Sequence, residues 1–221
     1  MPDIKAQMEI DFGARGGLAL VTFQGDYENT NFKIGYTAGV VANIPVGDFS
    51  VQPSVLLSNK GSKAEYSGEL NSYQEKFSLN YLEVPVYGIY NFNLRTRNFQ
   101  LIGGPYVAYG MAGKYTREEV VDGNTYADET ENIQFVKDQV DREGFQIPFY
   151  NLDYGIKAGL GYVRDNIHFQ FVYSYGLSNL VAPFDGEDPP NSMINTSFQF
   201  SLSYFFEKKE EVVEEDEESD F

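Results

Sequence analysis

The chain has 221 residues and a formal net charge of −17, with 17 Tyr, 18 Phe and 21 Gly but no Trp and no Cys. The absence of cysteine excludes a disulfide scaffold and a thiolate metal site, and a single histidine, His168, argues against a histidine-based metal centre or catalytic triad. No run of about 18 apolar residues exists, which excludes a transmembrane helix, and so acidic a chain is a poor nucleic-acid binder.

The negative charge is concentrated in two segments. Residues 115–148 carry nine acidic and three basic side chains, and residues 207–221 carry nine acidic and two basic ones. These segments account for −6 and −7 of the net charge, so the rest of the chain is nearly neutral. A block of like charges without apolar periodicity repels itself and buries no core, so we expect 207–221 to be a disordered tail.

In chain order, a short polar lead-in at 1–8 precedes a series of segments in which every second residue is apolar. Residues 152–163 and 167–176 show the pattern most clearly, and the polar turn 164–166 joins them as a hairpin. Most segments have about ten residues or more, roughly what a tilted strand needs to cross a bilayer. The pattern predicts eight strands, at 9–23, 32–44, 49–60, 77–92, 99–114, 152–163, 167–176 and 195–206.

The connections between these strands alternate between long and short. Long polar loops are expected at 25–31, 61–76, 115–148 and 177–194, and short turns at 45–48, 93–98 and 164–166. Outer-membrane barrels have short periplasmic turns and long external loops. We therefore expect an all-β, eight-stranded, antiparallel, up-and-down transmembrane β-barrel over residues 9–206. Both termini would be periplasmic, and a signal peptide would have been removed, because 1–12 has no apolar signal core.

Alternation alone does not distinguish this barrel from a soluble one. The distinction comes from the second phase of each strand, the residues that alternate with the apolar ones. A soluble barrel would show charged residues and Thr to water, whereas here the second phase is mainly Gly, Ser and Ala. Small residues suit the narrow interior of an eight-stranded barrel. The charges in this phase are expected to form a paired network in the lumen, in preference to an ion path: Asp11, Arg15, Lys33, Lys60, Glu83, Lys114, Asp153 and Lys157.

Aromatic residues of the apolar phase gather near the strand ends, as expected for girdles at the two membrane interfaces. The predicted girdle residues at the short-turn end are Phe49, Tyr90, Phe99, Tyr162, Tyr204 and Phe206, and those at the long-loop end are Phe23, Tyr109, Tyr154 and Tyr175.

Two features raise alternatives that the residues themselves do not favour. His168 invites an enzyme hypothesis, but no matching Ser/Asp pattern accompanies it, so we expect a polar lumen or rim residue. The acidic run 122–132 suggests calcium, but it lacks the DxDxDG spacing of an EF-hand loop, and a solvated loop is expected. We therefore predict no enzymatic activity, no cofactor and no catalytic or metal-binding residue.

Several phrases of the chain resemble a known family. FKIGYTAGVVANIPVGDFSVQPSVLLSNKGSK (32–63), YLEVPVYGIYNF (81–92), LIGGPYVAYG (101–110), YGIKAGLGYV (154–163) and YSYGLSNL (173–180) are similar to the PorT-like outer-membrane β-barrel family of Bacteroidetes. The resemblance spans nearly the whole barrel but carries no catalytic signature. It implies an eight-stranded outer-membrane barrel. PorT itself is an accessory of type IX secretion, whereas most relatives have no assigned role.

The expected function is that of a structural outer-membrane component or a subunit of a larger outer-membrane assembly, acting through its external loops. The expected partners are outer-membrane lipid, lipopolysaccharide and proteins of such an assembly. A small-solute pore and a lipid-modifying enzyme are the alternatives. The acidic tail departs from the family habit of ending at the last strand.

Overall fold

The computed structural model describes residues 10–26, 30–67, 71–94, 97–121, 124–137, 148–183 and 192–207. These residues form thirteen strands. Among them, no helix is long and apolar enough to cross a membrane. The expected lead-in at 1–8, and the expected acidic tail except for its first residue, lie outside the described residues.

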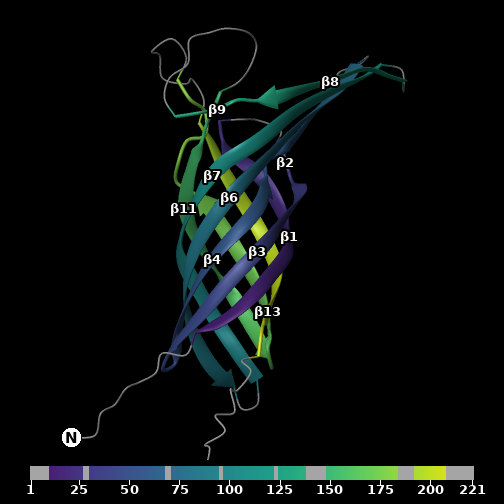
Figure 1. Ribbon diagram of the computed structural model, residues 1–221. Helices are drawn as coiled ribbons and strands as arrows, with labels where there is room; N and C mark the ends of the chain where they lie inside the picture. The colour runs from purple at the N-terminus through teal and green to yellow at the C-terminus, as the bar shows by residue number, and fades with distance from the viewer. Residues whose placement is uncertain are drawn as a thin grey trace, which may run out of the picture.

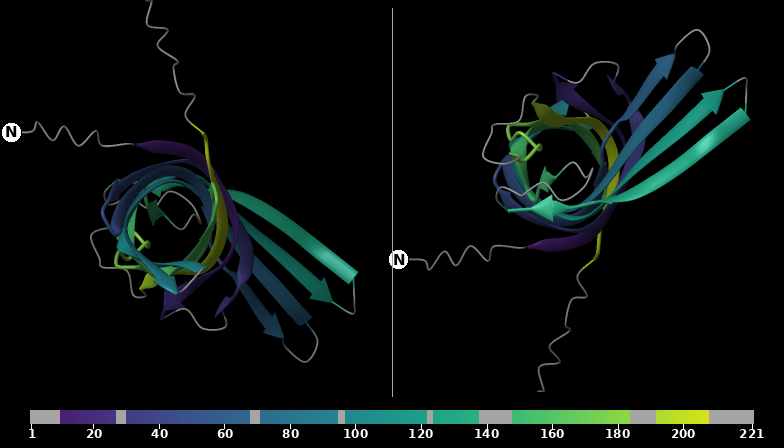
Figure 2. Two further views of the ribbon diagram at one scale, coloured as in Figure 1. Left: turned by 90° about the horizontal axis from the view of Figure 1, so that it is seen from below. Right: turned by 90° about the horizontal axis from the view of Figure 1, so that it is seen from above.

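Eight of the strands form a closed antiparallel ring. Each of the eight pairs with the next of the eight in chain order, including β6 with β7. The first strand, β1, also pairs with the last, β13, which closes the ring (Figures 1 and 2). This confirms the predicted eight-stranded barrel. Its strands are β1 (Asp11–Gly25), β3 (Lys33–Val46), β4 (Phe49–Lys60), β6 (Asn71–Leu94), β7 (Arg97–Val121), β11 (Leu152–Arg164), β12 (Ile167–Gly176) and β13 (Met193–Phe205).

The two phases of each strand lie on opposite faces of the wall. On three adjacent strands Leu160, Phe171 and Phe200 lie side by side, with 59%, 53% and 56% of their surface exposed. The next row, Gly161, Gln170 and Ser201, is buried inside. So continuous an exposed apolar surface is far larger than a soluble monomer shows. It suits a strand whose outer face meets lipid.

The short turns lie at one end of the barrel. Gly47 and Asp165 open two of them with φ values of 63° and 53°, the conformation that two-residue hairpin turns require. The start of β1 and the end of β13 lie at this same end, where Phe206 donates its backbone N–H to the carbonyl oxygen of Phe12. The first and last strands therefore begin and end beside the short turns.

Aromatic rings form a nearly continuous band on the outer face at the short-turn end. Ring contacts of 5.0–6.5 Å run from Phe49 through Tyr90, Phe92, Phe99 and Tyr162 to Phe169, across β4, β6, β7, β11 and β12. On β13 and just beyond it, Tyr204 and Phe206 are exposed and in ring contact with each other. At the long-loop end, Tyr109 and Tyr154 are exposed and Tyr175 is half-buried.

Most of the loops expected at 61–76 and 115–148 are instead strands. β5 (Lys63–Ser67) and β8 (Asn124–Ile133) pair with the outer parts of β6 and β7, which run on beyond the ring, and β2 (Thr30–Asn31) pairs with β5. We call this five-stranded extension the fin; Figures 1 and 2 show it leaving the barrel at a steep angle. The alternation rule missed it because both of its faces are polar, so no apolar phase marks its strands.

A β-bulge marks the boundary between the barrel wall and the fin on β7. Asn80 faces Ala112 and Tyr81 faces Gly110, so Met111 is an extra residue. One extra residue exchanges the two faces of everything that follows. The expected lumen position of Lys114 is therefore wrong: its side chain is exposed on the outer face.

The long-loop end of the lumen is capped by an apolar cluster. Short strands β9 (Phe135–Val136) and β10 (Phe149–Tyr150) pair across the mouth. Phe23, Phe77 and Phe149 pack ring against ring there at 5.7–6.3 Å. The expected girdle position of Phe23 is therefore wrong, since only 2% of its surface is exposed.

The lipid assignment of the outer face is tested by one substitution at mid-strand. Leu160→Arg is expected to reduce the free energy of unfolding from vesicles by about 2–4 kcal/mol, because the charge enters hydrocarbon. The measurement is urea titration in lipid vesicles, followed by the heat-modifiable gel shift, with Leu160→Ala as control. A Leu160→Arg protein that folded as a water-soluble monomer would contradict the assignment.

The inner face gives a contrasting prediction at Gly159, the residue before Leu160. A Cβ atom on Gly159 would clash with the backbone oxygen of Phe171. Gly159→Ala is therefore expected to destabilise the barrel in vesicles and in detergent alike, since its cause is steric.

Candidate functional site

Four charged side chains from three strands meet in the middle of the lumen. Lys60 of β4 lies 2.9 Å from Glu83 of β6 and 2.9 Å from Asp153 of β11. Lys157, four residues after Asp153 on β11, forms a second ion pair with Glu83. All four side chains are at most 7% exposed. Two cations and two carboxylates thus form a chain of zero formal charge across the interior.

Neutral groups complete this cluster. Asp153 accepts hydrogen bonds from Tyr106, Ser178 and Asn195 at 2.9–3.4 Å. The ring of Tyr106 also lies under both ammonium groups, 4.1 Å from Lys60 Nζ and 5.1 Å from that of Lys157. An ion buried without a partner costs several kcal/mol, so pairing and hydrogen bonding are what make these charges tolerable inside the barrel.

A second polar cluster lies nearer the short-turn end, around Arg15. Its guanidinium donates to Ser203, Ser54 and Gln52 at 2.8–3.3 Å. Gln52 in turn lies 3.5 Å from His168 Nδ1, and the His168 ring packs on Phe205. Asp11 is half-buried at the rim, where it accepts a hydrogen bond from Asn43.

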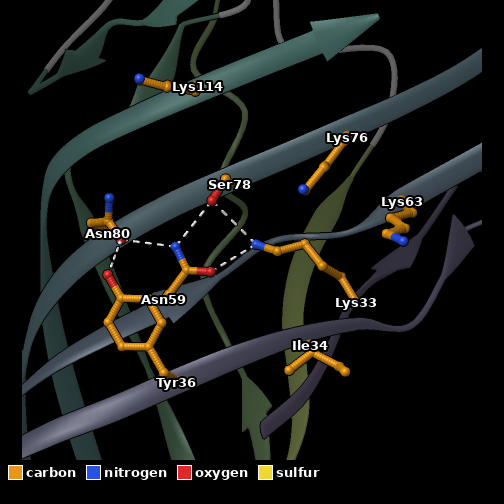
Figure 3. A pocket seen from close by; sticks show the side chains of 9 residues that line it. All are labelled: Lys33, Ile34, Tyr36, Asn59, Lys63, Lys76, Ser78, Asn80 and Lys114. Atoms are coloured by element: carbon orange, nitrogen blue, oxygen red, sulfur yellow. Dashed lines mark hydrogen bonds between the residues drawn. The ribbon is translucent and has the colours of Figure 1, made fainter. Parts of the chain in front are cut away.

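The remaining two predicted lumen charges lie at the base of the fin. Lys33 is buried at the start of β3, where it hydrogen-bonds the backbone of Lys60 but forms no ion pair with Glu83 or Asp153. Lys114 is exposed, and both lysines line one open pocket on the outside of the protein (Figure 3). Of the eight predicted charges, five are therefore in the two lumen clusters, Asp11 lies at the rim and two lie at the base of the fin.

Sequence reasoning missed the neutral members of the lumen. Tyr81, Tyr87 and Tyr106 are at most 1% exposed and carry the cation–π contacts of both clusters. The sequence signal that could have placed them in the lumen is their position in the polar phase of β6 and β7, which alternates with the lipid-facing residues. Within the described residues, no group of three or more His, Asp or Glu side chains is arranged to hold a metal ion.

The lumen cluster makes a prediction about charge balance. Glu83→Gln leaves Lys60 and Lys157 with one carboxylate between them, so the free energy of unfolding is expected to fall by about 3–5 kcal/mol. The double variant Glu83→Gln/Lys157→Gln restores neutrality and is expected to lose less than the sum of the single variants. Exposed Glu207→Gln is the control, and strict additivity in urea titrations would contradict the paired network.

Comparison with known proteins places these features in a family. No curated protein matches the sequence. Among solved structures, surface protein A of Neisseria aligns with 12% identity over 88% of this chain and 97% of its own, with a TM-score of 0.45. Ail of Yersinia pestis, crystallised with a heparin analogue, aligns with 16% identity over 90% and 100%, with a TM-score of 0.44. Likenesses at this level carry no argument about function.

The family-model match is more decisive. Residues 5–182 match the model described as outer membrane protein beta-barrel domain. This span holds seven of the eight barrel strands, and the eighth, β13, closes the ring. The chain therefore belongs to the family of outer-membrane proteins with a β-barrel domain.

Proposed function

We propose that this outer-membrane barrel is a closed, non-catalytic membrane anchor that presents its fin to another protein of an outer-membrane assembly. The observation that carries the proposal is the contrast between the two parts of the molecule. The lumen is filled by paired polar groups and capped by aromatic rings, whereas the fin projects from the barrel and, among the described residues, its strand β8 pairs with β7 alone.

The filled lumen supports an anchor over a pore. The four-charge cluster spans the interior, and Tyr81, Leu79 and Phe149 above it are completely buried. Eight strands enclose an interior just wide enough for side chains to fill. His168 contacts Gln52 and Phe205, and its cross-strand partner Ser203 is completely buried and accepts a hydrogen bond from Arg15. A hydroxyl held in this way suits a structural role better than that of a nucleophile.

The fin supports recognition of a protein. Among the described residues β8 pairs with no strand other than β7, so its second edge lies open to strand addition. An exposed edge of this kind is a template for strand addition by a partner. Glu118 and Glu131 are exposed on the fin and add charge-based selectivity.

The resemblance to PorT-like barrels makes a secretion-related assembly the first candidate for the partner. In that arrangement the short turns and both chain ends face the periplasm, and the fin stands on the outer surface. The tail 207–221, with its many carboxylates, would then be a second, periplasmic contact for a basic surface.

A conductance measurement tests the closed lumen. Purified protein in planar bilayers is expected to give no reproducible single-channel steps, because side chains fill the interior. A general porin reconstituted in the same lipid is the positive control. Stable steps that survive removal of the fin residues 116–131 would contradict the proposal.

Site-specific photo-crosslinking tests the fin. A photoreactive residue at Glu118 or Glu131 is expected to give one recurring protein adduct in native outer membranes. The same residue at lipid-facing Phe171 is the matched control and is expected to give none. The heat-modifiable gel shift verifies that each variant is folded. Equal adducts from the fin and from Phe171, or no protein adduct from the fin, would contradict the proposed role.

A further inference from the structure

An open, lysine-rich pocket lies where the fin leaves the barrel wall. It has a volume of about 500 Å³. Its cationic lining consists of Lys33, Lys63, Lys76 and Lys114, from β3, β5, β6 and β7 (Figure 3). Four ammonium groups around one open pocket are an unusual concentration in a chain of net charge −17.

The folded chain holds these lysines against their mutual repulsion. Lys63 and Lys76 are direct cross-strand partners. Ser78 pairs with Lys114 and Lys76 with Thr116, so Lys114 is a diagonal neighbour of Lys76 on the same face. Like charges directly opposite each other destabilise a sheet. No ion pair within 4 Å joins any of the four lysines to a carboxylate of the described residues.

Lys33 is the most constrained of the four. Only 4% of its surface is exposed, and its ammonium group donates to Asn59 Oδ1 at 2.8 Å, to the carbonyl oxygens of Lys60 and Phe77, and to Ser78 Oγ. All four acceptors are neutral. They satisfy its hydrogen bonds but leave its charge uncompensated, which is costly for a buried group.

The pocket also has an apolar side. Ile34 and Tyr36 belong to the lipid-facing phase of β3 and are 71% and 51% exposed. Tyr36 Oη donates to Asn80 Oδ1 at 3.3 Å, at the floor of the pocket. Towards the tip of the fin the same face becomes acidic: Glu65 and Glu118 both flank Gln74, one pair beyond Lys76. The lysines thus lie between the apolar wall and the acidic fin.

We propose that this pocket binds the phosphorylated head group of a glycolipid in the outer leaflet. Ile34 and Tyr36 contact the start of its acyl region, while the lysines neutralise a phosphate at the membrane surface. Lysine suits phosphate as a point charge, and each basic residue near an anionic membrane surface contributes about 1 kcal/mol. The orientation rests on the proposed function, in which the fin faces outward.

The test measures binding of bis-phosphorylated lipid A to the full-length protein in detergent micelles. Lys63→Gln/Lys76→Gln is expected to weaken binding roughly 30-fold, from the loss of two cations. Lys137→Gln/Arg164→Gln removes two exposed cations outside the pocket and is expected to change affinity by less than about two-fold on the same basis. The heat-modifiable gel shift shows that each variant is folded.

Two further probes distinguish the sources of the anion. Dephosphorylated lipid A is expected to bind the native protein as weakly as the phosphorylated form binds the double variant. Inorganic phosphate at millimolar concentration is not expected to compete. Equal affinity of the two double variants would overturn the site, and effective competition by inorganic phosphate would overturn the lipid assignment. Neither result depends on the fin binding a protein, so crosslinking from Glu118 tests the proposed function separately.

Discussion

The constraint on which the structure depends is the closure of eight strands into a ring. Closure removes every edge from the membrane-spanning part, as hydrocarbon requires, but it leaves an interior only wide enough for side chains. Every charge that enters this interior must find a partner there, because water is scarce and the cost of an isolated ion is several kcal/mol. The chain of Lys60, Glu83, Lys157 and Asp153 meets this requirement with side chains from three strands.

The same constraint bears on where the proposed function is located. A lumen filled by side chains favours an anchor over a pore, which directs the proposal to the long-loop end of the barrel. There β6 and β7 continue as one paired ribbon from the wall into the fin, without an intervening loop. A continuous ribbon holds a binding surface more firmly than separate loops, since its backbone hydrogen bonds are already formed.

The barrel was predictable from the sequence because its signal is simple. Each strand has one apolar phase, as from Leu152 to Tyr162, and closure follows from an even count with alternating loop lengths. The fin was not predictable in this way, because polar groups lie on both of its faces: Lys76 and Glu118 on one, and the cross-strand pair Glu75 and Arg117 on the other. Phe23 shows a second limit. It shares the inward phase of Arg15 and Val21 on β1, so strict alternation places it in the lumen cap, and its position at a strand end alone wrongly indicated a membrane girdle.

Lys114 shows how much depends on a single residue. Period-two reasoning carried from Phe99 along β7 puts it inside, in the same phase as Tyr106 and Ala108. The bulge at Met111 reverses the phase just where the strand leaves the wall. Inside, an ammonium at this level would face the aromatic cap around Phe77 and Tyr81, where burying a charge is costly. Outside, Lys114 lies beside Lys63 and Lys76. In the proposed site, the phosphate of a lipid balances their charge there. The extra residue Met111 thus removes the charge of Lys114 from the lumen and adds it to the proposed outer site. The strand that carries it, β7, is common to the barrel wall and the fin.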